Sequence, residues 1–217
     1  GGWGTGAWGT GTTSNDVLRL WSQSNFGEDL IFGPRGGGVY YWSSSSGTGV
    51  RAVNLTSLTG ASDVPTVQNY VLVSDVSRFV LAFGCNEAGS ATQNPMLIRW
   101  SDQESAVDWT PAATNQAGDF ELQTVGSLKA GKRVRGVNLL FTDVDVHVST
   151  YIGLPYVYSF EKAGSGCGLI SSQAVAAIDT AAIWMSKSGF WVYDGYVKPL
   201  PSDVSDYVFG NMNFNQS

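Results

Sequence analysis

The sequence predicts an all-β protein with a β-propeller-like architecture, and three observations lead to this prediction. Short runs rich in β-branched and aromatic residues alternate with clusters of Gly, Ser, Asn and Asp, whereas helical periodicity is nearly absent. Pairs of such runs recur at intervals of roughly 40–50 residues, the repeat length of propeller blades. Several second strands end in a ring that would pack one sheet against the next: Trp42, Phe83, Trp109 and Tyr193.

A β-sandwich remains open as an alternative, because it shares the strand length and the alternation. At the propeller spacing, 217 residues supply four or five blades, so we expect a small circle or one that further polypeptide completes. We divide the chain into a Gly/Trp-rich arm (residues 1–16), a propeller-like domain (residues 17–200), and a short helix with a tail segment (residues 201–217).

Four segments predict hairpins, taken here in chain order. The segment DLIFGPRGGGVYYW predicts strands over residues 30–32 and 39–42 around a glycine turn. YVLVSDVSRFVLAF predicts strands over residues 70–73 and 79–83. In MLIRWSDQESAVDWTP, Trp100 and Trp109 flank a polar turn, and VNLLFTDVDVHVSTYIG bends near residues 142–145.

The C-terminal part predicts further strands and one helix. AVAAIDTAAIWMSKSGFWVYDG supplies at least three strands, broken near residues 178–180 and 187–189. In PSDVSDYVF we expect a helix of about two turns outside the sheets, with Ser202 as N-cap and Asp203 in its first turn. Its apolar face would carry Val204, Tyr207 and Val208.

Composition excludes several classes of function. Charged residues make up 14% of the chain, against about 25% in an ordinary domain, so Gly, Ser and Thr or partner proteins must complete the surface. The net charge of −6 argues against a nucleic-acid-binding face. One modest basic cluster is interpreted as a solvated hairpin turn: Lys129, Lys132, Arg133 and Arg135.

No apolar run approaches the roughly 18–20 residues that span a bilayer, so no membrane anchor is expected. The chain starts with Gly-Gly rather than Met and shows no signal-peptide pattern, so we expect it to be processed or part of something longer. Cys85 and Cys167 lie far apart and predict two buried free thiols, with a single disulfide as the alternative.

The N-terminal GGWGTGAWGTGTT satisfies G-x-G-x-x-G at Gly4, Gly6 and Gly9. A dinucleotide site needs a strand before this motif and a helix after it, and neither is predicted, so no cofactor is expected. The segment is better described as a five-residue repeat that carries Trp3 and Trp8. Two tryptophans on a glycine-rich arm need a surface that buries them, so we expect an assembly arm.

The strongest candidate for chemistry is DVDVHVS, which places Asp143, Asp145 and His147 at i, i+2 and i+4 on one strand face. Such a cluster suits a metal or Ca²⁺ site or an acid–base pair, but it lacks the ligand loop that contains glycine. We favour a polar outward face, with the alternating valines 144, 146 and 148 directed inward. No catalytic motif is found, so an enzyme is not expected.

WSDQESAVDW resembles the Asp-box turn of sialidase-like propellers, in which Ser101 and Asp102 would bond backbone N–H groups of the turn. Sialidases also need an arginine cluster and a Tyr–Glu pair. The arginines here are dispersed, so we interpret the turn as a folding device: Arg19, Arg35, Arg51, Arg78 and Arg99.

Three blocks resemble a family of tailed-phage virion proteins: RLWSQSNFGEDLIFGPRGGGVYYW, PMLIRWSDQESAVDWTPAATNQAGD and SGFWVYDGYVKPLPSDVSDYVFGNMN. The Trp-Gly-Thr-Gly repeats and YIGLPYVYSFEKAGSGCGLIS are similar to the same family, so the resemblance covers most of the chain. These are propeller-like tail proteins akin to the hub, nozzle or packaged-DNA stabilisation proteins of short-tailed phages. Family members usually continue beyond this sequence, and residues 129–138 resemble them less.

The resemblance implies a structural protein in the virion tail, forming rings, often of six subunits, around the DNA channel below the portal. Its expected partners are copies of itself and neighbouring tail, portal or adaptor proteins. Phage DNA would pass without specific binding, since an acidic surface repels it. The candidate interface residues are Trp3, Trp8, Gly36, Gly37, Gly38, Pro199, Pro201, Tyr207 and Phe209.

A carbohydrate-binding propeller for host-surface attachment is the alternative function. Aromatic side chains that are exposed would stack on sugar faces, whereas the same side chains could instead pack between blades. A lectin would show two or more equivalent pockets of similar sequence, which we do not find. The aromatic candidates are Trp42, Trp191, Tyr193 and Tyr196.

Overall fold

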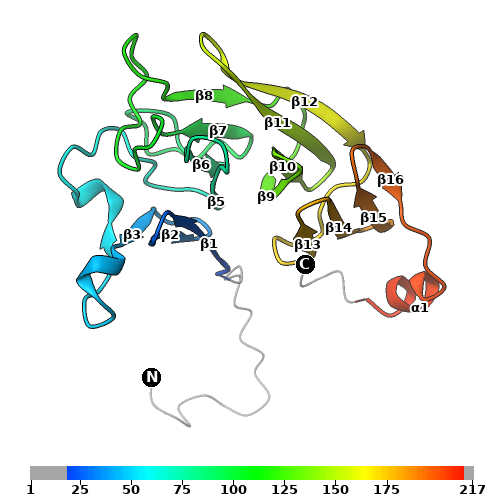
Figure 1. Cartoon of the computed structure of the whole chain (residues 1–217). Coiled ribbons are helices and arrows are strands. Elements are labelled where there is room, and N and C mark those ends of the chain that lie inside the picture. The colour runs from blue at the N-terminus through cyan, green and yellow to red at the C-terminus, as the bar shows by residue number, and fades with distance from the viewer. Residues whose placement is uncertain (1–18, 213–217) are drawn as a thin grey trace.

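The computed structural model describes residues 19–212, and its strands form four antiparallel sheets of four strands each. In every sheet the strands follow one another in chain order, so each sheet is a meander, as in a propeller blade. Figure 1 shows the four blades arranged in an arc, with blades 1 and 4 at its ends. The all-β, propeller-like prediction is therefore confirmed, with four sheets rather than the two of a sandwich.

The strand bounds follow the chain through the four blades. Blade 1 contains β1 (Trp21–Phe26), β2 (Asp29–Pro34), β3 (Tyr40–Trp42) and β4 (Val53–Asn54). Blade 2 contains β5 (Tyr70–Val73), β6 (Val80–Phe83), β7 (Leu97–Trp100) and β8 (Gly118–Glu121). Blade 3 contains β9 (Leu128–Val134), β10 (Val137–Thr142), β11 (Asp145–Gly153) and β12 (Val157–Ser165). Blade 4 contains β13 (Val175–Ile178), β14 (Ala181–Ser186), β15 (Gly189–Tyr193) and β16 (Val197–Pro199).

The described helices are short: two 3₁₀ turns, η1 (Ser44–Ser46) and η2 (Leu55–Ser57), and the helix α1 (Ser205–Gly210). Within residues 19–212, no helix has the length and apolar character that crossing a membrane would require.

Most predicted hairpins are confirmed: β2 pairs with β3, β5 with β6, and β10 with β11. The strands β13 and β14 also end close to the two predicted breaks, and β15 begins at the second of them. In β5 and β6 every residue is buried, which explains why these strands read as continuous apolar runs rather than as alternating ones.

The third predicted hairpin is wrong. β7 pairs with β8, and Trp109 lies in the long loop between these strands. The Trp109 ring is nevertheless buried, and its Nε1–H donates to the carbonyl of Ala106 at 2.8 Å. The carboxylate of Asp108 fixes this loop by accepting hydrogen bonds from Ser62 Oγ at 2.8 Å and Asn115 Nδ2 at 3.0 Å. A loop residue therefore supplies the ring that the pattern assigned to a strand.

The predicted Asp-box contacts are formed with different partners. Ser101 Oγ accepts a hydrogen bond from the backbone N–H of Val80 on the neighbouring strand, at 3.0 Å. Asp102 Oδ1 accepts one from the N–H of Gln116, across the long loop, at 2.7 Å. Both side chains therefore join separate segments rather than cap a tight turn.

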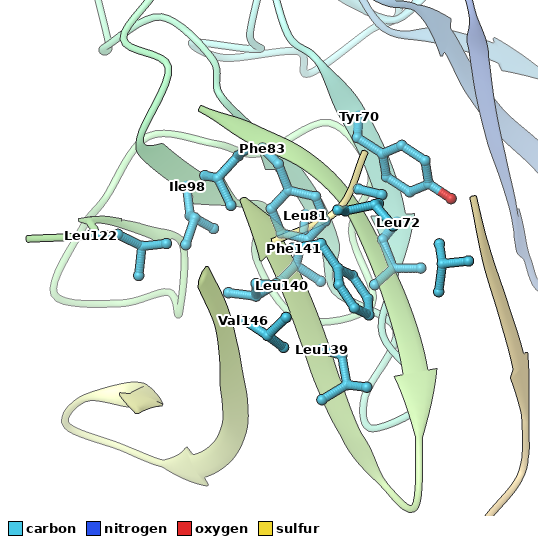
Figure 2. Packing of buried hydrophobic residues seen from close by; sticks show 14 of the residues in the cluster. Tyr70, Leu72, Leu81, Phe83, Ile98, Leu122, Leu139, Leu140, Phe141 and Val146 are labelled. Carbon is cyan, nitrogen blue, oxygen red and sulfur yellow. The ribbon is translucent and has the colours of Figure 1, made fainter. Parts of the chain in front are cut away.

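Face-to-face packing of neighbouring blades forms the core. The larger cluster joins blades 2, 3 and 4, and Figure 2 shows Leu81 and Phe83 of blade 2 against Leu139, Leu140 and Phe141 of blade 3. The first strands of successive blades pack in order, β1 on β5, β5 on β9 and β9 on β13. A smaller cluster joins blades 1 and 2, and its members include Ile31, Val71, Val80, Ala82 and Trp109.

Aromatic rings occupy these inter-blade contacts. Phe141 of blade 3 meets Trp184 of blade 4 edge-on, with ring centroids 5.2 Å apart. Trp100 of blade 2 meets Tyr158 of blade 3 in the same way at 5.4 Å. Phe83 and Tyr193 belong to the same cluster, as the sequence predicted.

Two serine side chains connect blades 1 and 2. The Oγ atoms of Ser22 and Ser24 on β1 accept hydrogen bonds from the backbone N–H groups of Val71 and Val73 on β5, at 3.0 and 3.1 Å. Within its own sheet, β5 pairs with β6 alone. The two serines therefore occupy the edge of β5 that no strand covers.

The helix α1 differs from its prediction. It begins at Ser205, and Ser202 lies in the turn before it, where its carbonyl accepts the N–H of Ser205 at 3.1 Å. Tyr207 is 75% exposed, and Phe209 makes the contact with blade 4, its ring centroid 5.3 Å from that of Phe190. The predicted N-cap and apolar face are therefore wrong, because one aromatic ring outweighs the weak periodicity of so short a helix.

The basic cluster also lies elsewhere than predicted. Lys129, Lys132 and Arg133 belong to the strand β9, and Arg135 follows it in the turn to β10. Arg133 forms an ion pair with Asp75 at 2.5 Å. Only the end of the cluster therefore lies in a turn.

The two cysteines, Cys85 and Cys167, are free and buried, as predicted. Burial raises the pKa of the Cys85 thiol to about 12. This thiol is therefore protonated at neutral pH and is a poor nucleophile.

Gly131→Ala tests the packing between blades 2 and 3. A Cβ at this position of β9 would lie 2.4 Å from Cε2 of the buried Phe83 ring. We expect a loss of about 1–3 kcal/mol in the free energy of unfolding, as for other overpacked cores, measured by urea denaturation. In the control Gly49→Ala, the new Cβ has open space around it, so the change should be small. Equal stability of both variants would contradict the close approach of these blades.

Candidate functional site

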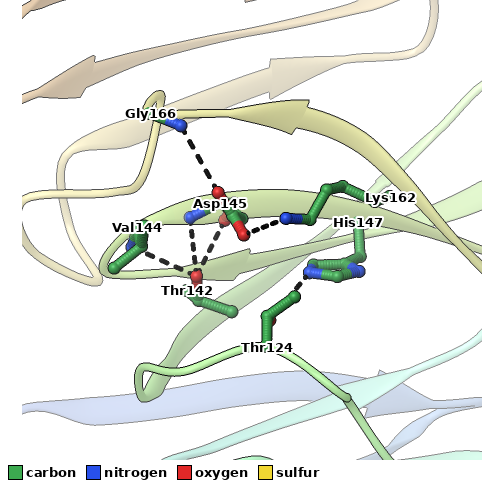
Figure 3. Close-up of polar contacts among 7 residues, drawn as sticks. All are labelled: Thr124, Thr142, Val144, Asp145, His147, Lys162 and Gly166. Carbon is green, nitrogen blue, oxygen red and sulfur yellow. Dashed lines mark hydrogen bonds and ion pairs between the residues drawn. The ribbon is translucent and has the colours of Figure 1, made fainter.

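The polar cluster of β11 is buried, which corrects the predicted outward face. Figure 3 shows Asp145 paired with Lys162, whose Nζ lies 2.6 Å from Oδ2. Nε2 of the buried His147 lies 3.4 Å from Thr124 Oγ1, in the connection between blades 2 and 3. The prediction fails because blades 2 and 4 pack against blade 3, and Asp145 and His147 are buried with its inner strands rather than facing solvent.

Asp143 lies apart from the other two residues, in the turn between β10 and β11. Its Oδ1 accepts a hydrogen bond from the N–H of Ser127 at 2.7 Å. Thr142, which the sequence analysis missed, organises this turn: its Oγ1 accepts from the N–H groups of Val144 and Asp145 at 3.1 and 2.7 Å. A threonine at the first position of a polar turn is the signal that could have identified it.

These contacts give the cluster a structural role. Burial is the main cause that lowers the pKa of His147, Lys162 lowers it further, and Asp145 acts in the opposite direction. The imidazole is therefore neutral at pH 7. In residues 19–212, no group of three or more His, Cys, Asp or Glu side chains is arranged to hold a metal ion.

The outer face of blade 1 is a candidate interaction surface. Ser22 and Ser24 point toward blade 2, so the alternate residues of β1 point away from it. On that outer side, the ring centroid of Phe32 lies 6.0 Å from that of Trp21 and 5.7 Å from that of Tyr40. Trp21 is 54% exposed. We call these three residues the blade 1 end face.

Blade 4 has a corresponding surface at the other end of the arc (Figure 1). Ala182 and Trp184 of β14 are buried in the cluster shared with blade 3, so Ile183 between them points to the opposite side. Ile183 is 46% exposed and Ile178 is 67% exposed. We call these two isoleucines the blade 4 end face.

The two ends of the arc approach each other near the inner strands. The side chain of Gln173, shortly before β13, donates a hydrogen bond from Nε2 to the carbonyl of Trp21 at 3.4 Å. The sequence analysis missed both end faces. The alternation in WSQSNF was the available signal, because it separates Trp21 from the serines that face blade 2.

The predicted interface residues have different surroundings. Trp3 and Trp8 lie outside the described residues. In the glycine turn, the N–H of Gly36 donates to the carbonyl of Gln68 at 2.7 Å, and the carbonyl of Gly37 accepts from the N–H of Gln68 at 3.0 Å. Gly38 lies between this contact and Asn54, whose Nδ2 would be 3.2 Å from an added Cβ. The turn backbone is therefore engaged within its own chain.

The C-terminal candidates divide into two groups. Pro199, Pro201 and Tyr207 are exposed, and their side chains are accessible to a neighbour. Phe209 instead packs on Phe190 of blade 4. Phe190 lies on the same side of blade 4 as Ile183, so Phe209 packs beside the blade 4 end face.

The aromatic candidates for sugar stacking are mostly engaged in packing. Tyr193 is buried, and Trp191 packs against the same core cluster. Trp42 is half-buried and donates from Nε1 to the carbonyl of Val50 at 3.1 Å. Tyr196 is exposed, with Lys198 Nζ 4.7 Å from its ring centroid. For Trp191 and Tyr193, packing between blades is therefore the correct interpretation.

Comparisons with known proteins give no family for this chain. No family model matches it, and no curated protein matches it. Among solved structures, it is similar to one described as the AfRom2 CNH domain, with a TM-score of 0.44 and 11% sequence identity. The match covers 85% of this chain and 56% of that one, so this chain spans little more than half the length of that protein.

The pH dependence of stability tests the buried site. His147 is the one histidine of the sequence, and its pKa is lower in the folded protein than its ordinary value of 6.5. At a pH between the folded and the unfolded pKa of His147, the unfolded chain binds more protons than the folded one. The free energy of unfolding therefore falls as the pH drops below about 6.5. We expect urea denaturation to show this fall in the wild type and a flatter profile in His147→Gln. An unchanged slope in the variant would contradict a buried, neutral imidazole.

Proposed function

We propose that this protein is a structural subunit of a bacteriophage tail that works by packing against copies of itself and neighbouring tail proteins. The observation that supports this most directly is the pair of exposed apolar end faces on blades 1 and 4. The resemblance of the sequence to tailed-phage virion proteins supplies the biological setting.

The internal blades explain why the end faces point to assembly. Blades 2 and 3 use the residues on their two faces for contact with neighbouring blades. The end faces carry side chains of the same kind, aromatic on blade 1 and aliphatic on blade 4. Within residues 19–212 no further blade packs on them, and on blade 4 the helix α1 covers only the neighbouring Phe190. Exposed apolar patches of this kind mark interaction sites in soluble proteins.

The two end faces differ from each other, so copies joined through them would associate head to tail. Such heterologous contacts produce a ring when the rotation closes. A ring of this kind agrees with the proposed position around the DNA channel. The net charge of −6 suits a conduit, because an acidic wall does not retain DNA.

A charge placed on either end face should weaken assembly. We expect Trp21→Glu and Ile183→Glu to raise the dissociation constant of the oligomer at least about tenfold, measured by analytical ultracentrifugation. The control Val125→Glu changes a residue that is 92% exposed and lies outside both end faces, and it should assemble like the wild type. A wild-type chain that stays monomeric at every concentration would refute assembly through these faces.

The position in the virion needs its own test. Mass spectrometry of purified phage particles, followed by immunogold electron microscopy, should detect the protein at the tail. Its absence from intact particles would contradict the proposed function, whatever its state of association in solution.

A further inference from the structure

A cavity of about 400 Å³ opens between blades 1 and 2. Its walls come from the connection between β4 and β5 and from the loop between β6 and β7, and Arg99 of β7 contributes to its lining. Arg99 is only 2% exposed. A buried cationic side chain that lines an open cavity is unusual, because burial of a charge is costly without compensation.

The partners of Arg99 within the chain are neutral. Its Nη2 donates to the carbonyls of Asp63 and Trp109 at 2.7 and 3.4 Å, and its Nη1 donates to the carbonyl of Asn86 at 3.3 Å. In the described part of the chain, no carboxylate forms an ion pair with Arg99. These three bonds involve Nη1 and Nη2, whereas a guanidinium carries five N–H donors in all. Carbonyl dipoles rather than a direct ion pair therefore compensate the buried positive charge, and the Asp63 carboxylate lines the same cavity.

The cavity is held in a fixed shape. Asn86 Oδ1 accepts hydrogen bonds from the N–H groups of Thr66 and Val67 at 2.9 and 3.1 Å, and Asn86 Nδ2 donates to the carbonyl of Ser90 at 2.6 Å. This side chain thus binds the two wall segments to each other. A preorganised wall of this kind lowers the entropic cost of ligand binding.

The remaining lining determines the class of ligand. Thr56, Thr66 and Ser90 add hydroxyl groups, and none of the lining residues is aromatic. The exposed carboxylate of Asp63 is an acceptor for sugar hydroxyls, and it would disfavour a doubly charged phosphate. A ligand with one carboxylate and several hydroxyl groups could pair its carboxylate with the guanidinium. Its hydroxyls could then form hydrogen bonds with the Thr and Ser hydroxyls and with the Asp63 carboxylate.

We propose that the cavity between blades 1 and 2 binds a small hydroxylated carboxylate of the uronic-acid class, with its carboxylate directed at Arg99. This site lies within one chain and is independent of the proposed tail function. It also differs from a lectin site built on exposed aromatic rings, because charge and hydroxyl groups provide the recognition.

Isothermal titration of the full chain with D-glucuronate tests this proposal, with D-glucose as the matched probe that lacks the carboxylate. We expect saturable binding of glucuronate, with a dissociation constant on the order of 1 mM, and no binding of glucose. Ala91→Glu places a negative charge in the cavity lining and should weaken glucuronate binding at least about tenfold. The control Ala113→Glu alters an exposed residue outside this cavity and should bind like the wild type.

Arg99→Lys keeps the charge but removes the planar fork, and it should also lose glucuronate binding. Because Arg99 joins three loops, circular dichroism must first show that this variant folds; if it unfolds, Ala91→Glu alone decides. Four outcomes would each overturn the proposal. The heats with glucose and glucuronate could be equal, or the protein could bind inorganic phosphate but not glucuronate. It could also bind none of the probes, or Ala91→Glu could bind glucuronate as well as the wild type. Trp21→Glu should retain binding, which separates a failure of this site from a failure of assembly.

Discussion

The contact between neighbouring blades is the constraint on which the rest of this structure depends. Blades 2 and 3 lie between two other sheets, so residues on both faces must suit a dry interface. This requirement explains why every residue of β5 and β6 is buried. It also explains a glycine at position 131, where the Phe83 ring leaves no room for a side chain. The buried carboxylate of Asp145 is compatible with this packing because it forms an ion pair with Lys162.

The residue pattern predicted strands and hairpins correctly wherever apolar residues in the sequence are also buried between blades. The hairpins β5–β6 and β10–β11 combine apolar strands with polar turns, and both were predicted. The pattern failed at Trp109, because a loop fixed by Asp108 can bury a ring as well as a strand does. It failed at His147 because alternation assumes that one face of a sheet meets solvent. The helix α1 was placed too early because six residues carry too little periodicity to define a start.

The candidate sites could not be predicted to the same extent. The three carbonyls around Arg99 come from residues 63, 86 and 109, which lie in three separate loops. No spacing in the sequence indicates that these loops converge, so Arg99 was judged one of several dispersed arginines. The end faces were missed for a related reason: the difference between an internal face and a terminal one depends on the number and order of blades.

The serines of β1 have a consequence for the fate of the protein in a crowded solution. A strand that pairs on one side only offers a row of unsatisfied amides, which can template the addition of strands from other molecules. Ser22 and Ser24 occupy two of these amides on β5 with hydroxyl oxygens, which accept the hydrogen bonds without extending the sheet. The hydroxyls thus leave fewer free amides on β5 for a foreign strand to pair with, while blade 1 remains a separate sheet. In the assembly proposed above, copies would join through side chains, and blocked backbone edges would keep that association from becoming aggregation.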